Sequence, residues 1–228
     1  MGPIFKSHDG SIERSRLGTV VSTGTVGVNT PKQITLARQS RKFYRCDREG
    51  MKVMRYNLDG SDVEALVSSD SSAEDRKDMC RWCVGIAVDE SKGYLYWSQK
   101  AHQRDPKGVS CEPRLTTQHK SRQFFDKLPE PIDLESYEST QILYRTDRGD
   151  PPFGNSLNRD FIGDLWDEPE REALTRRLHE AIALALDTNT KTAYVADLPG
   201  GLYAVGLKTK RKTVLFPELA GITGIALA

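Results

Sequence analysis

Four polar residues that could assist a reaction follow closely on tyrosine-containing segments that recur along the chain. Arg48, Gln99 and Arg148 carry N–H groups that could donate to a carbonyl oxygen and stabilise negative charge on it, and His102 could act as a general acid. The alternative for such polar corners is a solvated rim or a set of salt bridges. Because loops on a rigid scaffold often carry functional side chains, we treat these four as candidate catalytic residues.

A second group of residues could contact a ligand. Arg81 and Trp82 place a cation beside an aromatic ring just before a strand-like segment. Asp150, Phe153 and Asn155 lie in a loop that contains Pro and Gly and is therefore expected to be stiff. We predict that these five residues bind substrate.

The sequence predicts neither a metal site nor an organic cofactor. The four cysteines are Cys46, Cys80, Cys83 and Cys111, and the CxxC motif ending at Cys83 has no second ligand pair at zinc-binding spacing. The motif leads into a strand-like segment, whereas a thioredoxin motif leads into a helix. The serines lack a G-x-S-x-G elbow and the four histidines lie in unrelated contexts, so no catalytic triad is indicated.

The elements that must position these residues recur with a period near 50. The tyrosines that mark the repeat are spaced 52, 48 and 50 residues apart, and they are Tyr44, Tyr96, Tyr144 and Tyr194. A short apolar segment lies about ten residues before each one, and a fifth copy ends the chain; these segments are 33–36, 85–89, 131–134, 182–187 and 224–228. This period, with several short strands and turns per unit, is typical of β-propeller blades.

The best-defined unit is residues 42–67. It predicts a strand at Phe43 and Tyr44, a second strand over 51–56 and a third over 63–67. An Asp-Gly pair between the last two favours a tight hairpin turn, because Gly tolerates positive φ. An Asp lies three residues after the repeat tyrosine in three of the copies, as Asp47, Asp147 and Asp197.

Residues 164–186 carry two conflicting patterns. Leu174, Leu178, Ile182 and Leu186 lie at i, i+4 spacing, which predicts an amphipathic helix. The repeat instead predicts a strand over 182–186. We expect that strand to form and leave residues 170–179 open between helix and strand.

Composition limits the function classes. The 228 residues include 33 Lys and Arg against 32 Asp and Glu, so the net charge of +1 argues against nucleic-acid binding through bulk charge. The mean hydropathy is −0.55, and no apolar run approaches the roughly 20 residues that a membrane span needs. The first ten residues show no apolar signal segment, so we expect a cytoplasmic protein that acts on neither nucleic acid nor membrane.

The motifs resemble a known family. Tyr96-Trp97-Ser98-Gln99 resembles the YWTD motif of six-bladed propellers of the low-density-lipoprotein-receptor type, and residues 55–61 resemble the RxNLDGS strand and turn of those blades. The phrases DREGMKVMRYNLDGS, RWCVGIAVD, LPEPIDLE, TDRGDPPFGNSLNR and GITGIALA resemble a fungal intracellular branch over roughly residues 9–228. That branch occurs in secondary-metabolite biosynthesis and includes hetero-Diels–Alderases, which join a tropolone o-quinone methide to a sesquiterpene alkene.

The resemblance implies an all-β, YWTD-like β-propeller of a shortened or incomplete six-bladed type. It also implies that Asp47, Asp147 and Asp197 are structural, with each carboxylate accepting hydrogen bonds from nearby backbone. Four recognisable blades cover about residues 31–80, 81–128, 129–178 and 179–220; residues 1–30 are expected to hold partial blade strands and a loop, and residues 221–228 a closing strand. Asp9–Arg14 reads as the third strand of a preceding blade; with Gly221–Ala228 it could instead complete one composite blade and close a smaller ring. Because an open ring leaves faces unburied and edges unpaired, the isolated chain is predicted to be poorly soluble or a homo-oligomer.

The implied activity is that of a cofactor-free pericyclase acting on a hydrophobic small molecule. Arg48, Arg148 and Gln99 would polarise the quinone-methide carbonyl, and His102 would assist loss of water from the precursor alcohol. Two alternatives stay open: a non-catalytic interaction module or inactive relative, and a calcium-dependent lactonase or hydrolase with Asp, Asn and Glu converging on the axis.

The chain departs from the YWTD motif at the Trp position, which is occupied by Arg45, Arg145 and Val195. Burying an unpaired arginine is costly, so the two arginines are expected to need partners.

Overall fold

A computed structural model describes the backbone of residues 4–8, 11–16, 19–22, 28–68, 72, 77–78, 81–100, 109–113, 122–125, 127–162 and 171–227. Within these residues the fold is almost entirely β, with one short 3-10 helix at Glu138–Thr140. The strands form one three-stranded sheet and four four-stranded sheets, all with antiparallel neighbours.

The sheets follow one another along the chain. The first contains β1 (Ile4–His8), β2 (Ser11–Arg16) and β3 (Thr19–Ser22). The second contains β4 (Pro31–Ala37), β5 (Lys42–Asp47), β6 (Lys52–Asn57) and β7 (Glu64–Ser68). The third contains β8 (Cys83–Asp89), β9 (Tyr94–Gln99), β10 (Val109–Pro113) and β11 (Arg122–Phe125). The fourth contains β12 (Pro131–Tyr137), β13 (Ile142–Asp147), β14 (Ser156–Phe161) and β15 (Arg171–Thr175), and the fifth contains β16 (Ala181–Asp187), β17 (Thr192–Asp197), β18 (Leu202–Gly206) and β19 (Lys212–Phe216).

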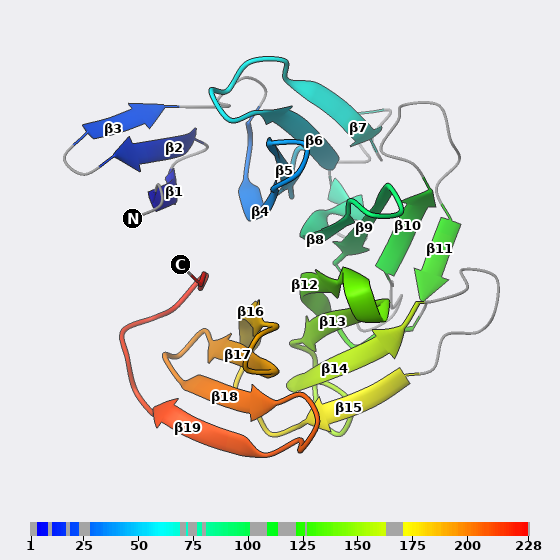
Figure 1. Cartoon of the computed structure of the whole chain (residues 1–228), viewed down its shortest axis with the longest axis vertical. Helices are drawn as coiled ribbons and strands as arrows, with labels where there is room; N and C mark the ends of the chain where they lie inside the picture. The colour runs from blue at the N-terminus through cyan, green and yellow to red at the C-terminus, as the bar shows by residue number, and fades with distance from the viewer. Residues whose placement is uncertain are drawn as a thin grey trace.

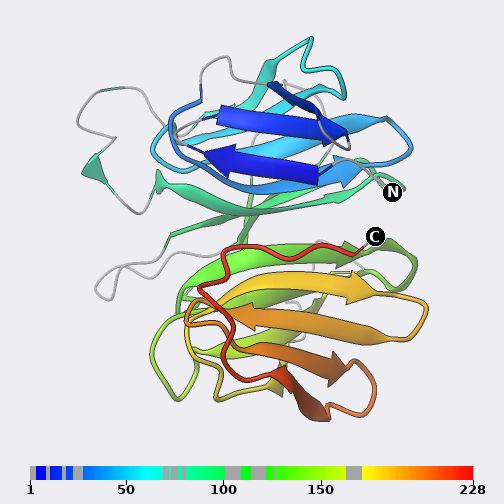
Figure 2. The ribbon, with the colours of Figure 1, turned by 90° about the vertical axis from the view of Figure 1, so that its left-hand side faces the viewer.

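The sheets are arranged around a common centre as an arc (Figure 1). Strands β4, β8, β12 and β16 face that centre, and β7, β11, β15 and β19 lie at the periphery. One side is open between the sheet of β1–β3 and the sheet of β16–β19, and both ends of the chain lie there (Figures 1 and 2). This arrangement confirms the predicted β-propeller.

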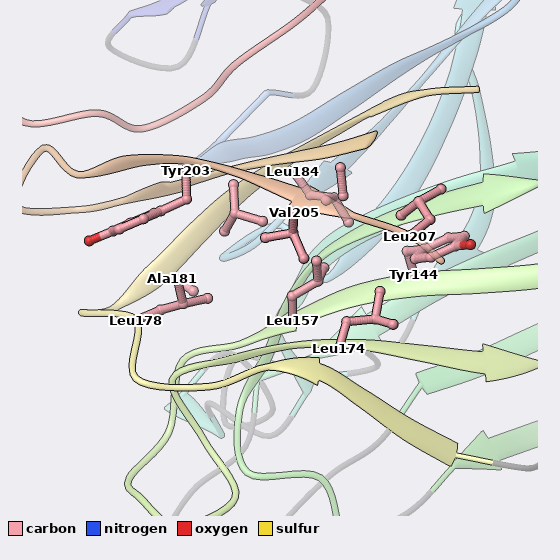
Figure 3. Close-up of a cluster of buried hydrophobic side chains, with 11 residues drawn as sticks. Tyr144, Leu157, Leu174, Leu178, Ala181, Leu184, Tyr203, Val205 and Leu207 are labelled. Carbon is pink, nitrogen blue, oxygen red and sulfur yellow. The ribbon is translucent and has the colours of Figure 1, made fainter. Parts of the chain in front are cut away.

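The hydrophobic core lies between neighbouring blades rather than within one sheet. Figure 3 shows the cluster between the last two sheets, where Tyr144 and Leu157 pack with Leu184 and Val205. We number the four four-stranded sheets as the first to fourth blades, starting with β4–β7. Similar clusters join the first blade (β4–β7) to the second (β8–β11) and the second to the third (β12–β15). Burial of apolar side chains at each of these contacts stabilises the stack, so a blade depends on its neighbours.

A bulge recurs near the start of each inner strand, where the pairing register shifts between Pro31 and Ile34, Cys83 and Ile86, Pro131 and Leu134, and Ala181 and Ala183. Gln33 reaches across the centre: its Oε1 accepts from the amides of Ile86 (2.5 Å) and Leu134 (3.2 Å). A β-carbon at Gly85 would collide with the Ile132 carbonyl oxygen, which explains why this bulge has no side chain. The inner strands therefore approach closely, and their inward amides are satisfied by polar side chains at the centre.

The hairpin predicted in residues 42–67 is present. The Asn57 amide donates to the Ser61 carbonyl at 2.9 Å, and Gly60 has φ +88°. The first strand is longer than predicted, because the polar-looking corner at Cys46 and Asp47 belongs to β5 and is buried.

The helical pattern of residues 170–179 did not lead to a helix. Residues 171–175 form β15, whose Glu172 lies opposite Arg159 of β14. Leu174 and Leu178 both enter the inter-blade core. The apolar spacing thus reflects contact with the neighbouring blade, and sheet pairing overrides the local periodicity.

One prediction for the chain ends differs from the structure. Residues 221–227 form no strand, although the repeat predicts one over 221–228. A strand exists only by pairing, and no second strand is placed beside this segment in the described residues. The third strand of an earlier blade is predicted over Asp9–Arg14; β2 (Ser11–Arg16) lies there and pairs with β1 on one side and β3 on the other, the position of a third strand in a blade without its first.

Candidate binding site at one mouth of the propeller

In each four-stranded sheet the innermost strand begins, and the second strand ends, at the same end of the blade. The residue pairs that mark this end are Pro31 with Asp47, Cys83 with Gln99, Pro131 with Asp147, and Ala181 with Asp197. We call this end the mouth. Loops from different blades meet here because antiparallel pairing repeats the same chain direction in every sheet.

A single backbone hydrogen bond recurs at the mouth. The amide that follows the second strand donates to the carbonyl that precedes the first, at 2.8–3.1 Å, in all four blades: Arg48 to Thr30, Lys100 to Trp82, Arg148 to Glu130, and Leu198 to Glu180. The donors therefore occupy one repeat position. Three of the four carry a positive charge, so the fold places cations from three consecutive blades around the same mouth.

Trp82 brings two of these cations together. The guanidinium carbon of Arg48 lies 4.8 Å from the centre of the Trp82 ring, and Lys100 Nζ lies 5.5 Å from it. Both distances are within the range of cation–π attraction, which partly offsets the repulsion between the cations. Trp82 thus holds the corners of the first and second blades close to each other.

Lys32, the second residue of β4, is a fourth cation at the mouth. Burial lowers the pKa of Lys32, and the charge of Arg48 lowers it further. Lys100 and Arg148 act in the same direction, and Glu49 acts in the opposite one. Lys32 therefore lies within electrostatic reach of the corner cations of all three blades, and its lowered pKa indicates positive charge around it.

Carboxylates neutralise part of this charge. Glu49 lies 2.5 Å from Arg48 Nη2, and Glu180 lies 3.0 Å from Arg148 Nη2. The Nε atom of Arg48 is buried and has no hydrogen-bond acceptor. The mouth consequently presents buried or half-buried donors that carry positive charge, which is the arrangement that stabilises negative charge on a ligand oxygen.

The structure brings several of the predicted residues together. Arg48 and Trp82 are in contact, and Arg148 shares their electrostatic environment through Lys32. Gln99 ends β9 at the mouth and is half-buried. Arg81 lies beside Trp82 in sequence and pairs with Asp78 at 3.3 Å. His102 lies outside the described residues.

The loop of residues 148–155 is attached to the segment that leads into the next blade. Phe153 is 69% exposed, and Arg176, which follows the peripheral strand β15, lies 5.9 Å from its ring. Asn155 accepts hydrogen bonds from the amides of Glu180 (2.6 Å, side chain) and Leu178 (3.0 Å, backbone). The Asp150 carbonyl accepts from the Gly154 amide at 2.9 Å within the loop. These contacts tie the loop to the next blade.

The repeat aspartates are structural in two blades, as predicted. Asp47 accepts from the amides of Asn29 and Thr30, both at 2.8 Å, and Asp197 accepts from the amide of His179 at 2.8 Å. Each carboxylate therefore fastens the segment that enters its blade. In the third blade Pro129 stands at the matching position and has no N–H to donate.

Arg145 replaces that missing donor for Asp147. Its guanidinium contacts Asp147 and lies 2.8 Å from Asp160, and Asn158 donates to Asp147 at 2.8 Å. Burial raises the pKa of Asp147 to about 6 and also raises that of Asp160, while the charge of Arg145 lowers both. Arg145 is thus a buried cation with two carboxylate partners, which explains how it can stand where the motif has Trp.

Sequence reasoning missed five residues at the mouth and the centre. Lys100 occupies the same repeat position as Arg48, so strict use of the repeat would have found it. Lys32 and Gln33 gave no such signal, because they lie where the pairing register shifts near the start of β4. The other two missed residues are Asp133 and Glu135 of β12. Burial raises the pKa of Asp133 to about 7 and that of Glu135 to about 8, and the charge of Asp133 raises the pKa of Glu135 further.

Among the side chains that the structure places, no group of three or more His, Cys, Asp or Glu could share a metal ion. Asp133 instead accepts from the amides of Leu134 (2.9 Å) and Leu184 (2.7 Å), so it joins two inner strands.

The relatives of the chain are fungal. It is 51% identical over 244 residues to a Pyricularia oryzae protein described as low-density lipoprotein receptor-related protein 1, and the match covers 100% of this chain and 79% of that protein. The chain belongs to the family of this fungal receptor-related protein. It is also 37% identical over 240 residues to the 3-hydroxyacyl-CoA dehydrogenase-like protein LAM1 of Cochliobolus heterostrophus, covering 97% of this chain and 50% of that protein.

Structural comparison supports the same fold. A chain in the crystal structure of a nidogen–laminin complex matches with a TM-score of 0.74 and 18% identity, covering 99% of this chain and 83% of that one. This identifies the fold as a propeller of the YWTD type. No protein-family model matches the sequence. Where the structure describes the chain, it contains no helix long and apolar enough to cross a membrane.

Proposed function

We propose that this propeller is a cytoplasmic enzyme of secondary metabolism that acts on a hydrophobic, oxygen-bearing small molecule at the mouth. The specific activity proposed is that of a hetero-Diels–Alderase-like pericyclase, which joins a tropolone o-quinone methide to a sesquiterpene alkene without a cofactor. The observation that carries the proposal is the convergence of Arg48, Lys100 and Arg148 from three blades, with Lys32 beside them.

The chemistry asked of these residues is electrostatic. In the cycloaddition, electrons flow from the alkene to the methide carbon while the carbonyl oxygen becomes the ether oxygen of the new ring. One C–C bond and one C–O bond form, and no atom is lost. If attack by the alkene runs ahead of C–O closure, negative charge builds on that oxygen in the transition state. Donors fixed around it lower the barrier because they need no reorganisation.

The test is incubation of the purified protein with a tropolone alcohol and a humulene-type alkene, with the adduct followed by mass. Arg48→Met is expected to lower the rate by about 10²-fold, the usual cost of removing one fixed oxyanion donor. Lys208→Met is the matched control, since Lys208 is exposed in the turn after β18, at the far end of its sheet. A wild-type rate equal to that of the protein-free control would contradict the proposal for this substrate pair.

A non-catalytic interaction module is the second candidate. It is favoured by three consecutive exposed apolar residues on the peripheral strand β19: Val214, Leu215 and Phe216. Within the described strands β19 pairs only with β18, so its outer edge is free to accept a further strand. Such a module would bind through this edge and leave the mouth without a chemical role.

A further inference from the structure

Ion pairs at the mouth, within the described residues, leave two of its four cations unpaired. The aspartates at this end are engaged elsewhere, since Asp47 and Asp197 accept from backbone amides and Asp147 pairs with Arg145. Glu49 pairs with Arg48 and Glu180 with Arg148. Lys32 and Lys100 form no ion pair with any residue that the structure describes. Glu130 precedes β12 at the same level, and it too makes no ion pair in the described part of the chain. Bringing like charges together from separate blades costs free energy, so this arrangement is most stable with an anion present.

Two of these cations also lack hydrogen-bond acceptors. Arg48 Nε is buried without a partner. Lys32 is exposed and donates to no described residue. Buried donors in native structures almost always have a protein or water acceptor, so Arg48 Nε needs an acceptor from outside the placed residues. Trp82 fixes the position of Arg48 and of Lys100 through its ring, which keeps the donors in place before any ligand arrives.

We propose that the mouth is an oxyanion-binding site in which Lys32, Arg48 and Lys100 hold the carboxylate, enolate or phosphate group of a ligand. The inference adds the charge state of the substrate to the proposed function. Only the biological use of the site rests on that proposed function. Glu49 and Glu180 flank the cations, so a compact group with one or two charges fits this field better than an extended polyanion.

The experiment is calorimetric titration of the full chain with benzoate, with the neutral isostere benzamide, and with inorganic phosphate, at low and at high salt. Benzoate is expected to bind at least about tenfold more tightly than benzamide, and added salt is expected to weaken benzoate binding. Lys32→Met is expected to weaken benzoate binding about tenfold, the change that follows the loss of one charged hydrogen bond. Lys100→Met is a second variant, and Lys208→Met is the control with the same charge change.

The outcomes separate the inference from the proposed reaction. Phosphate binding without benzoate binding supports the site and assigns it to phosphate-bearing ligands. The oxyanion site would be overturned by any of three results: equal affinity for benzoate and benzamide, no binding of either benzoate or phosphate, or equal effects of Lys32→Met and Lys208→Met. Benzoate binding without any adduct formation leaves the site intact and removes the pericyclase. Adduct formation without anion binding removes the oxyanion site and leaves the pericyclase intact.

Discussion

The most specific energetic prediction concerns the buried arginine of the third blade. Arg145→Met keeps a long side chain and removes the charge. Arg145 is 4% exposed, contacts Asp147 and lies 2.8 Å from Asp160. The variant therefore leaves two carboxylates in the sheet without their cation.

The expected cost follows from this burial. Removing one partner of a buried pair typically destabilises a protein by about 3–5 kcal/mol, because the remaining charge stays desolvated. Arg159→Met is the matched control in the same sheet. Arg159 pairs with Glu172 at 2.5 Å, but about a third of each side chain is exposed. Such a pair contributes about 0–1 kcal/mol, so the control should cost little.

The cost should also depend on pH. Burial already raises the pKa of Asp147 to about 6 and raises that of Asp160, and loss of the cation raises both further. A carboxyl whose folded pKa exceeds its unfolded value favours the folded state while it is protonated, and this contribution is lost as pH rises through the folded pKa. The penalty of Arg145→Met is therefore largest near pH 8 and smaller near pH 5.

Urea denaturation of the wild type, Arg145→Met, Arg159→Met and the double variant Arg145→Met with Asp160→Asn measures these differences. The double variant should be more stable than Arg145→Met near pH 8, because one of the orphaned charges is gone. The reasoning is refuted if Arg145→Met costs no more than Arg159→Met, or if its cost is the same at both pH values.

Three further predictions concern the centre and the open edge. Burial raises the pKa of Asp133 from 3.8 to about 7, so its protonation favours the folded state below about pH 4, and that contribution to stability is lost as pH rises through 7. Asp133→Asn should flatten this decline of stability with pH in urea titrations. An unchanged pH profile of the variant would count against this role. Gln33→Ala leaves the Ile86 amide without its acceptor and the Leu134 carbonyl without its side-chain donor, so it should cost about 1–3 kcal/mol by chemical denaturation; an unchanged free energy of unfolding would exclude this role. The wild type should associate or precipitate in size-exclusion chromatography and Phe216→Lys should shift it toward monomer, so a monodisperse wild-type monomer would argue against association through β19.

The repeat in the sequence predicted the fold well because each blade reuses one local solution. The apolar segment before each repeat tyrosine became an inner strand, and the Asp-Gly turn of residues 59–60 formed its hairpin. Asp47 and Asp197 have the structural role expected of them. These features depend on contacts within a blade, which a local pattern records.

Features that depend on contact between blades were harder to predict. The i, i+4 spacing of Leu174 and Leu178 indicated a helix, yet both side chains fill the core against the next blade. The partnership of Arg145 with Asp160 follows from strand pairing, and the missing amide of Pro129 explains it only once the register is known. The register shift beside Lys32 and Gln33 in β4 likewise depends on strand pairing, which no residue type predicts.

Ligand binding at the mouth, among the corner cations of three blades, can be measured directly by a nuclear magnetic resonance titration of the full chain with benzoate that follows the backbone amides. We expect the largest shifts on Lys32, Arg48, Lys100 and Arg148. The amides of Asn189 and Lys208, in turns at the far end, should stay unchanged. Shifts that are largest along β19 or in those far turns would contradict binding at the mouth.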